Sequence, residues 1–217
     1  MTANHLASEY AQRESRFLAE LSKANRNINI ISNVRLLVAL VFLVMLYFGF
    51  THHLLLYSLP LILFSFVLLV RNHGRLFDLK THLEHLAKIN KLEQEALQGN
   101  RSGFQTGSEF INARHPYSHD LDMFGEGSLF QFINRCNTII GKKTFAHRLE
   151  HPLPSREEII TQQRAVQELA PKIDFRQHFQ ASGMEIDEQT KDREQLLEWL
   201  QHPSFLLFQK EPSLLFS

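Results

Sequence analysis

The sequence has almost no cysteine, no excess of either charge, and one long stretch without any charged residue. Cys136 is the single cysteine, which excludes an intrachain disulfide framework and a multi-cysteine zinc site and fits a reducing compartment. The 23 basic and 23 acidic residues balance, so the chain lacks the strong positive charge typical of nucleic-acid-binding proteins. No Asp, Glu, Lys or Arg occurs from Leu36 to Val70, which excludes an ordinary soluble domain. The residues outside this stretch have the usual proportion of charged side chains, which excludes a protein that lies entirely within a membrane.

The charge-free segment, residues 36–70, consists of two apolar runs separated by Thr51-His52-His53. A helix that crosses the apolar part of a bilayer needs about 20 residues. The first run reaches this length if residues 30–34 extend it and the Arg35 side chain bends toward the lipid headgroups. Pro60 either kinks the second run or lies in its first turn. The pattern predicts a two-span transmembrane hairpin.

Positive charge flanks this hairpin on both sides but is absent from its loop. Arg13, Arg16, Lys23, Arg26 and Arg35 precede it, and Arg71, Arg75, Lys80, Lys88 and Lys91 follow it. Because cytoplasmic flanks carry an excess of Lys and Arg, both termini are expected in the cytoplasm, with the lipid bilayer as a partner. The alternative is a helical hairpin buried in a soluble core, which would need more surrounding protein than 217 residues provide.

Amphipathic helices are expected on both sides of the hairpin, over residues 1–35 and 71–98. Apolar residues recur at spacings of three and four, at Leu6, Tyr10, Phe17, Leu18 and Leu21 in the first and at Leu76, Leu79, Leu83, Leu86, Ile89 and Leu97 in the second. We therefore expect an antiparallel pair that projects from the bilayer. His82 and His85 lie one turn apart, but a metal site needs more ligands, so we interpret them as part of a solvated face.

A turn-rich linker is expected over residues 99–114, because Gly99-Asn100 favours the end of the preceding helix. A helical domain is expected over residues 115–217. Gly127-Ser128 should open its first helix, which Gly141 interrupts. The apolar face of this helix is predicted to comprise Leu129, Phe132, Ile133, Cys136 and Ile140. A buried cysteine on such a face is expected to be chemically inert.

Two more helices are predicted before Pro171. One carries Phe145 and Leu149 and stops before Pro152. The next begins with a capping box, in which Ser155 and a glutamate three residues later satisfy the first backbone N–H groups. Its apolar residues are Ile159, Val166, Leu169 and Ala170.

This region resembles the start of the helical core (lever) domain of the MutS family of DNA mismatch-repair ATPases. The matching residues are Ser128, Leu129, Asn134, Arg135, Thr138, Gly141, Leu149, Pro152, Leu153, Ile160, Arg164, Val166 and Leu169. The lead-in from His115 to Arg135, preceded by a two-span hairpin, is similar to membrane-anchored MutS-related proteins of bacteria. The resemblance covers residues 30–200 and is densest over 115–170. Cys136 departs from it, since the family often has threonine there.

The resemblance implies an all-α chain, anchored in the bacterial inner membrane, that forms the N-terminal part of an ATP-dependent DNA-binding protein of the mismatch-repair family. Full-length members would form homodimers and use ATP with Mg²⁺. Because the lever domain needs helices from later in the chain, these residues are expected to be a fragment without the ATPase domain and without catalytic activity of their own.

Three local patterns resemble functional motifs, and each is interpreted structurally. Gly141-Lys142-Lys143-Thr144 lacks the first glycine of a phosphate-binding P-loop, where Cys136 stands, and we interpret it as a turn between helices. Phe124-Gly125-Glu126 matches the Phe-x-Glu of mismatch recognition but lacks the domain around it. The potential metal ligands His115, His119, Asp120 and Asp122 are interpreted as seating the linker on the helical core. No catalytic, cofactor-binding or metal-binding residue is therefore predicted.

Two other functions stay open. The chain could be a membrane-tethered helical scaffold or interaction protein with no role on DNA. An enzyme that uses the His and Asp cluster at 115–122 is the third hypothesis. Naming mismatch repair itself would rest on family analogy alone.

Overall fold

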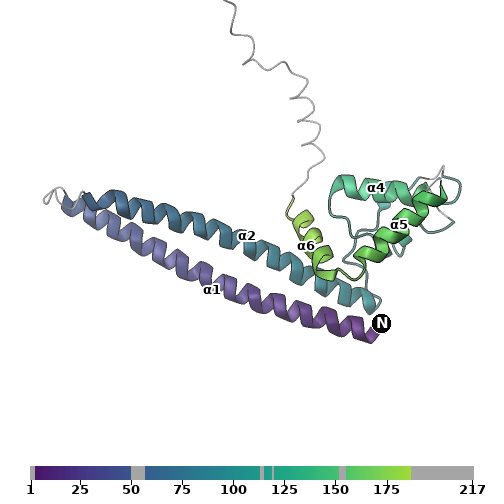
Figure 1. Ribbon diagram of the computed structural model, residues 1–217, viewed down its shortest axis with the longest axis horizontal. Helices are drawn as coiled ribbons and strands as arrows, with labels where there is room; N and C mark the ends of the chain where they lie inside the picture. Colours follow the sequence, from purple (N-terminus) through teal and green to yellow (C-terminus); the bar gives the residue numbers. More distant parts are fainter. Residues whose placement is uncertain (1–2, 50–56, 113–114, 119, 152–154, 187–217) are drawn as a thin grey trace, which may run out of the picture.

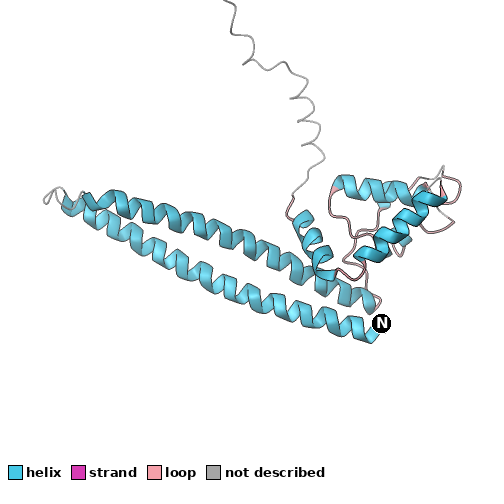
Figure 2. Cartoon of the chain, in the orientation of Figure 1, coloured by secondary structure: helices cyan, strands magenta, loops and turns pink. Residues whose placement is uncertain are grey.

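The computed structural model describes residues 3–49, 57–112, 115–118, 120–151 and 155–186. Within these ranges all regular structure is helical and no strand occurs, which confirms the all-α prediction (Figures 1 and 2). The elements are α1 (Ala3–Gly49), α2 (Leu59–Leu97), a short 3₁₀ helix η2 (Ser108–Phe110), α3 (Leu129–Ile133), α4 (Ile139–Glu150), α5 (Arg156–Leu169) and α6 (Ile173–Met184).

The two long helices lie side by side and antiparallel, and the smaller helices gather at the end of the pair that holds the N-terminus (Figure 1). Helix α1 runs without a break through Arg35 into the apolar run. Pro60 lies in the first turn of α2, where its missing N–H costs nothing, so it does not kink the helix. The predicted loop at Thr51-His52-His53 lies outside the described residues. Helix α2 ends at Leu97, and Gly99 follows with a φ of 94°, as its sequence predicts.

The side chains that α1 and α2 turn toward each other follow a heptad spacing along both helices. Among the buried and half-buried positions of α1, one such series is Phe17, Leu21, Ala24, Ile28, Ile31, Arg35, Val38, Phe42 and Met45. The corresponding series on α2 is Ile62, Phe66, Leu69, His73, Leu76, Lys80, Leu83, Ala87, Asn90 and Gln94. Steps of four and three residues are the pattern of a left-handed coiled coil. This seam runs through the charge-free half and the charged half alike.

The buried core lies only in the charged half of the pair. Phe17 and Ala24 of α1 pack there with Leu83, Leu86, Ala87 and Ile89 of α2 and with Ala181 of α6. Leu18 and Leu79, predicted on the apolar faces, are 47% exposed. Both positions lie one residue outside the heptad series. Leu86, one heptad after Leu79, is nevertheless buried, because it belongs to the cluster that includes Ala181 of α6.

The segment after α2 folds around Phe130, which is completely buried. The rings of Phe110, Phe124 and Phe145 surround it at centroid distances of 5.5, 5.7 and 5.5 Å. Gly107 adopts a φ of 69°, and a Cβ there would lie 2.6 Å from the Phe130 ring. Glycine therefore suits this position for two independent reasons.

The predicted helix over residues 128–140 is two helices, so this prediction was wrong. Helix α3 ends at Ile133, and Asn134 is extended, with its side-chain oxygen accepting the Cys136 N–H at 2.9 Å. Such a local side-chain bond competes with helix continuation. The predicted face was also wrong, since Leu129, Phe132 and Ile133 are exposed and Phe130 is buried. Cys136 lies between helices, not on one.

Side-chain caps start the next two helices. Thr138 accepts the Gly141 N–H at 3.1 Å at the start of α4. The Gly141-Lys142-Lys143-Thr144 segment therefore lies inside α4, which corrects its interpretation as a turn between helices. Ser155 accepts the Glu158 N–H at 3.2 Å, which confirms Ser155 as the N-cap of α5, one half of the predicted capping box.

Candidate functional site

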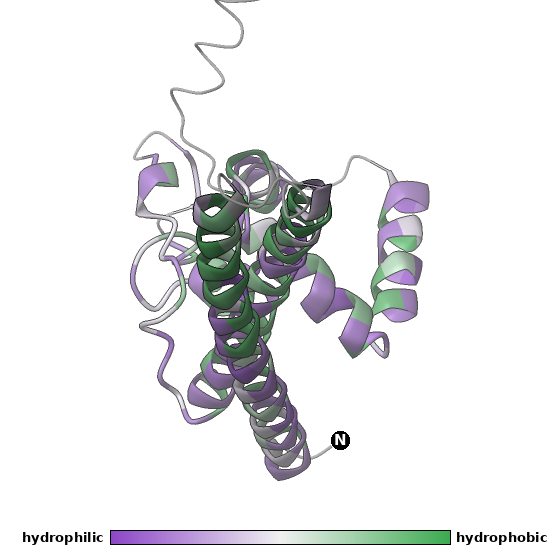
Figure 3. Ribbon diagram, turned by 90° about the vertical axis from the view of Figure 1, so that its left-hand side faces the viewer, coloured by the Kyte–Doolittle hydropathy of each residue, from purple (hydrophilic) through white to green (hydrophobic). Residues whose placement is uncertain are grey.

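The charge-free half of the α1–α2 pair presents an apolar surface that no described residue covers. No described residue from Asn29 to Thr81 is buried. Figure 3 shows the end of the pair that carries this surface in green, toward the viewer. The most exposed large side chains of this half are Leu36, Leu37, Leu40, Leu43, Tyr47 and Phe48 on α1 and Tyr57, Leu61, Leu63, Phe64, Val67 and Leu68 on α2. Monomeric soluble proteins rarely expose contiguous apolar patches of this kind.

Both long helices are long and apolar enough to cross a membrane by length and composition. The described residues do not form a hairpin buried in a soluble core, because none of them packs over this half. At 1.5 Å per residue, residues 30–49 of α1 span about 30 Å, the thickness of a bilayer's hydrocarbon core.

Three arginines lie at one level of the pair, where the apolar surface ends. Two contacts fix the register: the Ser58 hydroxyl to the Met45 sulfur at 3.3 Å and the Gln94 amide to Glu14 at 2.6 Å. Because the helices are antiparallel, each step along α1 from one of these contacts corresponds to one step in the opposite direction along α2. Arg35 then lies opposite residues 68–73 of α2. Arg35 therefore stands level with Arg71 and close to the level of Arg75.

Helix α6 is fastened to both long helices at the other end. Asn90 and Gln177, both buried, exchange two side-chain hydrogen bonds of 3.2 and 2.9 Å. From α1, Arg13 donates to Gln177 at 2.9 Å and to Asp174 at 2.6 Å. The hydrogen bond and charge of Arg13 hold the pKa of Asp174 below its usual value. Polar groups and the buried Ala181 thus fix α6 in one position.

The loop between α3 and α4 also contacts this region, where α6 meets α1 and α2 and which is called the junction below. Arg135 forms a two-pronged ion pair with Glu93 of α2, with N–O distances of 2.5 and 3.0 Å. The Arg135 guanidinium lies 3.9 Å from the centre of the Phe104 ring. Asn137 donates to the Gln180 carbonyl of α6 at 3.1 Å. Paired and stacked arginines of this kind have one well-defined geometry.

His82 belongs to the junction, which corrects its interpretation as part of a solvated face. Its Nδ1 lies 2.6 Å from Glu185 and its Nε2 lies 2.8 Å from Nδ1 of His178. The two imidazole rings stack, and the His178 ring contacts Phe17 edge-on. The sequence placed His82 on α2 but could not show that α6 covers it.

The potential metal ligands at 115–122, which are interpreted from the sequence as seating the linker, do not converge on a common point in the described part of the chain, where no group of three or more His, Cys, Asp or Glu residues could hold a metal ion. The His115 ring packs against Tyr117, and Asp122 forms a turn with a φ of 45°. His119 lies outside the described residues. Phe124, from the Phe-x-Glu string, packs against Phe110 and Phe130.

Cys136 is half-buried, and burial raises the pKa of its thiol, an effect that the nearby Lys142 partly offsets. A raised pKa reduces the thiolate fraction at neutral pH. Burial is thus the cause here as in the sequence prediction, although Cys136 lies between α3 and α4 and not on an apolar helix face.

Sequence reasoning missed the residues of the junction. Asn90 carries the best signal, because it is a polar residue at a heptad position among Leu83, Leu86 and Ala87. A single buried Asn at such a position specifies the register in which helices pack. Arg13, Asp174 and Gln177 carry no signal of this kind, since their contacts join segments far apart in the chain.

Part of this junction lies in a region that is similar to a known protein family. Residues 111–205 match the family model of MutS domain III, which supports a relationship of the chain to the MutS family. The match includes α3 to α6, so the helix that binds α1 and α2 belongs to the matched region. No curated protein and no solved structure matches the chain.

Proposed function

We propose that this chain anchors a MutS-related protein in the bacterial inner membrane. The α1–α2 pair would cross the bilayer with its charge-free half and hold the MutS domain III-like region at the cytoplasmic face. One observation carries the proposal: α6, inside the matched region, is held by hydrogen bonds to the same two helices whose other half is apolar and is not covered by any described residue.

The action on DNA is the second part of the proposal. In a protein that also carries the family's ATPase domain, this region would serve ATP- and Mg²⁺-dependent DNA binding as a homodimer. We assign no catalytic step to the described residues. The balanced charge of the chain fits a supporting role, because strong DNA binding requires several Lys and Arg contacts to phosphates.

A membrane-tethered scaffold without a DNA role is the second candidate. Apolar residues at helix surfaces favour it: Phe175 and Phe179 of α6 stack on each other and are 57% and 75% exposed. Such a pair suits contact with another protein. Binding of a labelled duplex by the purified chain in detergent separates the two candidates. The DNA role predicts weak binding that disappears as salt rises, and the scaffold predicts none at low salt.

Membrane insertion is tested by one matched pair of variants of the full chain expressed in a bacterium. Leu40 is 55% exposed in the apolar half and Leu18 is 47% exposed in the charged half. Arginine costs about 2.5–3.5 kcal/mol at the centre of a membrane helix. Leu40→Arg should therefore shift the chain out of carbonate-washed membranes, and Leu18→Arg should not. A wild-type chain recovered in the soluble fraction would contradict the proposal.

A further inference from the structure

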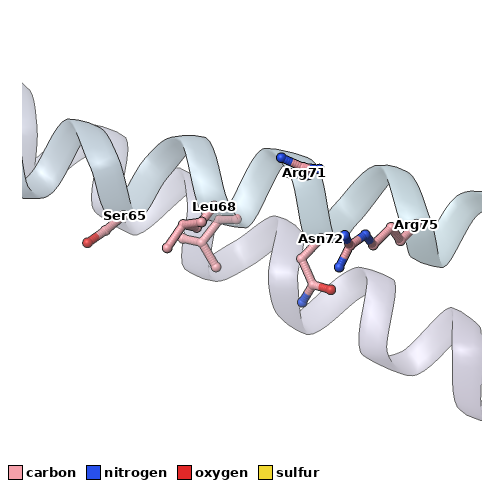
Figure 4. A pocket seen from close by; sticks show the side chains of 6 residues that line it. Ser65, Leu68, Arg71, Asn72 and Arg75 are labelled. Atoms are coloured by element: carbon pink, nitrogen blue, oxygen red, sulfur yellow. The ribbon is translucent and has the colours of Figure 1, made fainter.

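One flank of α2, beside its seam with α1, contains an open recess at the level where the apolar surface ends. Its volume is about 690 Å³, and Ser65, Leu68, Leu69, Arg71, Asn72 and Arg75 line it. Figure 4 shows Ser65, Leu68, Asn72 and Arg75 along α2, with Arg71 leaving the opposite edge of the helix. The recess is therefore apolar toward the charge-free half and polar toward the charged half.

The polar end of the recess carries positive charge that the protein does not neutralise. Arg71 and Arg75 are exposed, and neither has an ion pair or hydrogen bond among the described residues. No Asp or Glu occurs in the sequence from Leu21 to Phe77. Arg35 of α1 lies at the same level, which adds a third positive charge near this boundary.

The apolar end continues directly into the exposed surface of α2. Leu61, Phe64 and Leu68 are 69%, 62% and 51% exposed and precede the arginines at helical spacing. A molecule that fits both ends must carry hydrocarbon chains beside an anionic group. Free phosphate would use the arginines alone and leave Leu68 exposed.

We propose that this recess binds the headgroup of an anionic glycerophospholipid, an inference that rests on the proposed membrane anchoring. The Arg75 guanidinium would donate to the phosphodiester oxygens, the Asn72 amide supplies a neutral donor beside it, and Arg71 adds a second positive charge at the same level. Arginine suits this role because its planar fork matches phosphate geometry. The acyl chains lie along Leu68 and Phe64. The arginines thereby fix the depth of α2 in the membrane.

The test uses the full chain reconstituted in phosphatidylcholine vesicles with or without phosphatidylglycerol. Spin-labelled phosphatidylglycerol and phosphatidylcholine report, by electron paramagnetic resonance, the fraction of each lipid immobilised by the protein. Each arginine near an anionic headgroup should favour association by roughly fivefold. We expect wild-type protein to prefer phosphatidylglycerol several-fold and the Arg71→Gln/Arg75→Gln variant to lose most of this preference.

The matched control is Lys88→Gln/Lys91→Gln, which removes the same charge from exposed positions of α2 outside the recess. It should keep the preference, and Arg75→Lys, which keeps charge but not the fork, should retain part of it. Equal immobilisation of the two lipids by wild-type protein would overturn the inference. So would an equal loss of the phosphatidylglycerol preference in the lysine control, or displacement of the spin-labelled lipid by inorganic phosphate. Flotation of the vesicles separates the two proposals: a chain that does not float contradicts the anchoring itself, whereas a floating chain without lipid preference contradicts only this site.

Discussion

Asn90 of α2 and Gln177 of α6 each donate a side-chain hydrogen bond to the other, at 3.2 and 2.9 Å, although 87 residues separate them in the chain. Both side chains are buried, with 0% and 4% exposure. Two amides in this arrangement satisfy each other only in one relative position of the helices. The pair therefore determines where the MutS domain III-like region sits on the two long helices.

Replacing Asn90 with alanine should loosen α6. The Gln177 amide would lose its reciprocal partner in a buried place, which costs about 1–3 kcal/mol. Hydrogen–deuterium exchange of α6 in the full chain, in detergent micelles, measures the effect as faster exchange. The exposed Gln163→Ala in α5 is the control. The double variant Asn90→Leu/Gln177→Leu should recover part of the loss, because it leaves neither amide unpaired. Unchanged exchange in Asn90→Ala would contradict this role.

The ion pair between Arg135 and Glu93 should couple the α3–α4 loop to α2. Its two prongs and partial burial make it stronger than an exposed pair. A double-mutant cycle with Arg135→Met and Glu93→Gln, read from urea unfolding, should give a coupling of about 0.5–3 kcal/mol. Arg135→Lys should keep only part of it, because lysine cannot form both prongs. Strictly additive single effects would show that the pair contributes nothing.

The contact between Arg13 and Asp174 should make the attachment of α6 sensitive to acid. Arg13 lowers the pKa of the Asp174 carboxyl in the folded chain, first through its hydrogen bond and then through its charge. A lowered folded-state pKa means that the stabilisation is complete above the ordinary value of about 3.9 and is lost as the pH falls through the lower folded value. Asp174 is largely exposed, so the contribution is at most about 1 kcal/mol.

Exchange of α6, corrected for intrinsic rates, should therefore stay constant from neutral pH down to about pH 4 and rise below it. The Asp174→Asn variant should remove this contribution to the acid response while keeping the size of the side chain. An identical response in that variant would assign the acid sensitivity to other groups.

Phe130 should be the residue on which the folded state of segment 101–150 depends most. Phe130→Ala removes a fully buried ring from the Phe110, Phe124 and Phe145 cluster and should cost about 3–5 kcal/mol. Phe132→Ala, at 52% exposure, should cost about 1 kcal/mol or less. Gly107→Ala should also destabilise, because its φ of 69° strains any other residue and its Cβ would meet Phe130. Local exchange of this segment measures all three.

Local signals in the sequence were enough for the outlines of the fold. Pro60 at the start of α2, Gly99 after its end and the Ser155 N-cap of α5 all act within a few residues, and the structure has helices that begin or end beside them. The charge-free segment lies within the two long helices. The division of α3 from α4 was missed, because it depends on the Asn134 side chain and on the burial of Phe130 by distant rings. The position of α6 depends on contacts with Arg13 and Asn90, which no local pattern shows.

The most direct measurement is the topology of the chain in living bacteria, read with a membrane-impermeant maleimide. In a Cys136→Ser background, one variant carries His52→Cys between the apolar runs, and another carries Glu157→Cys at an exposed position of α5. Membrane anchoring with both ends in the cytoplasm predicts labelling of His52→Cys in intact cells and of Glu157→Cys only after the cells are opened. Protection of both sites, or labelling of Glu157→Cys from outside, would contradict it.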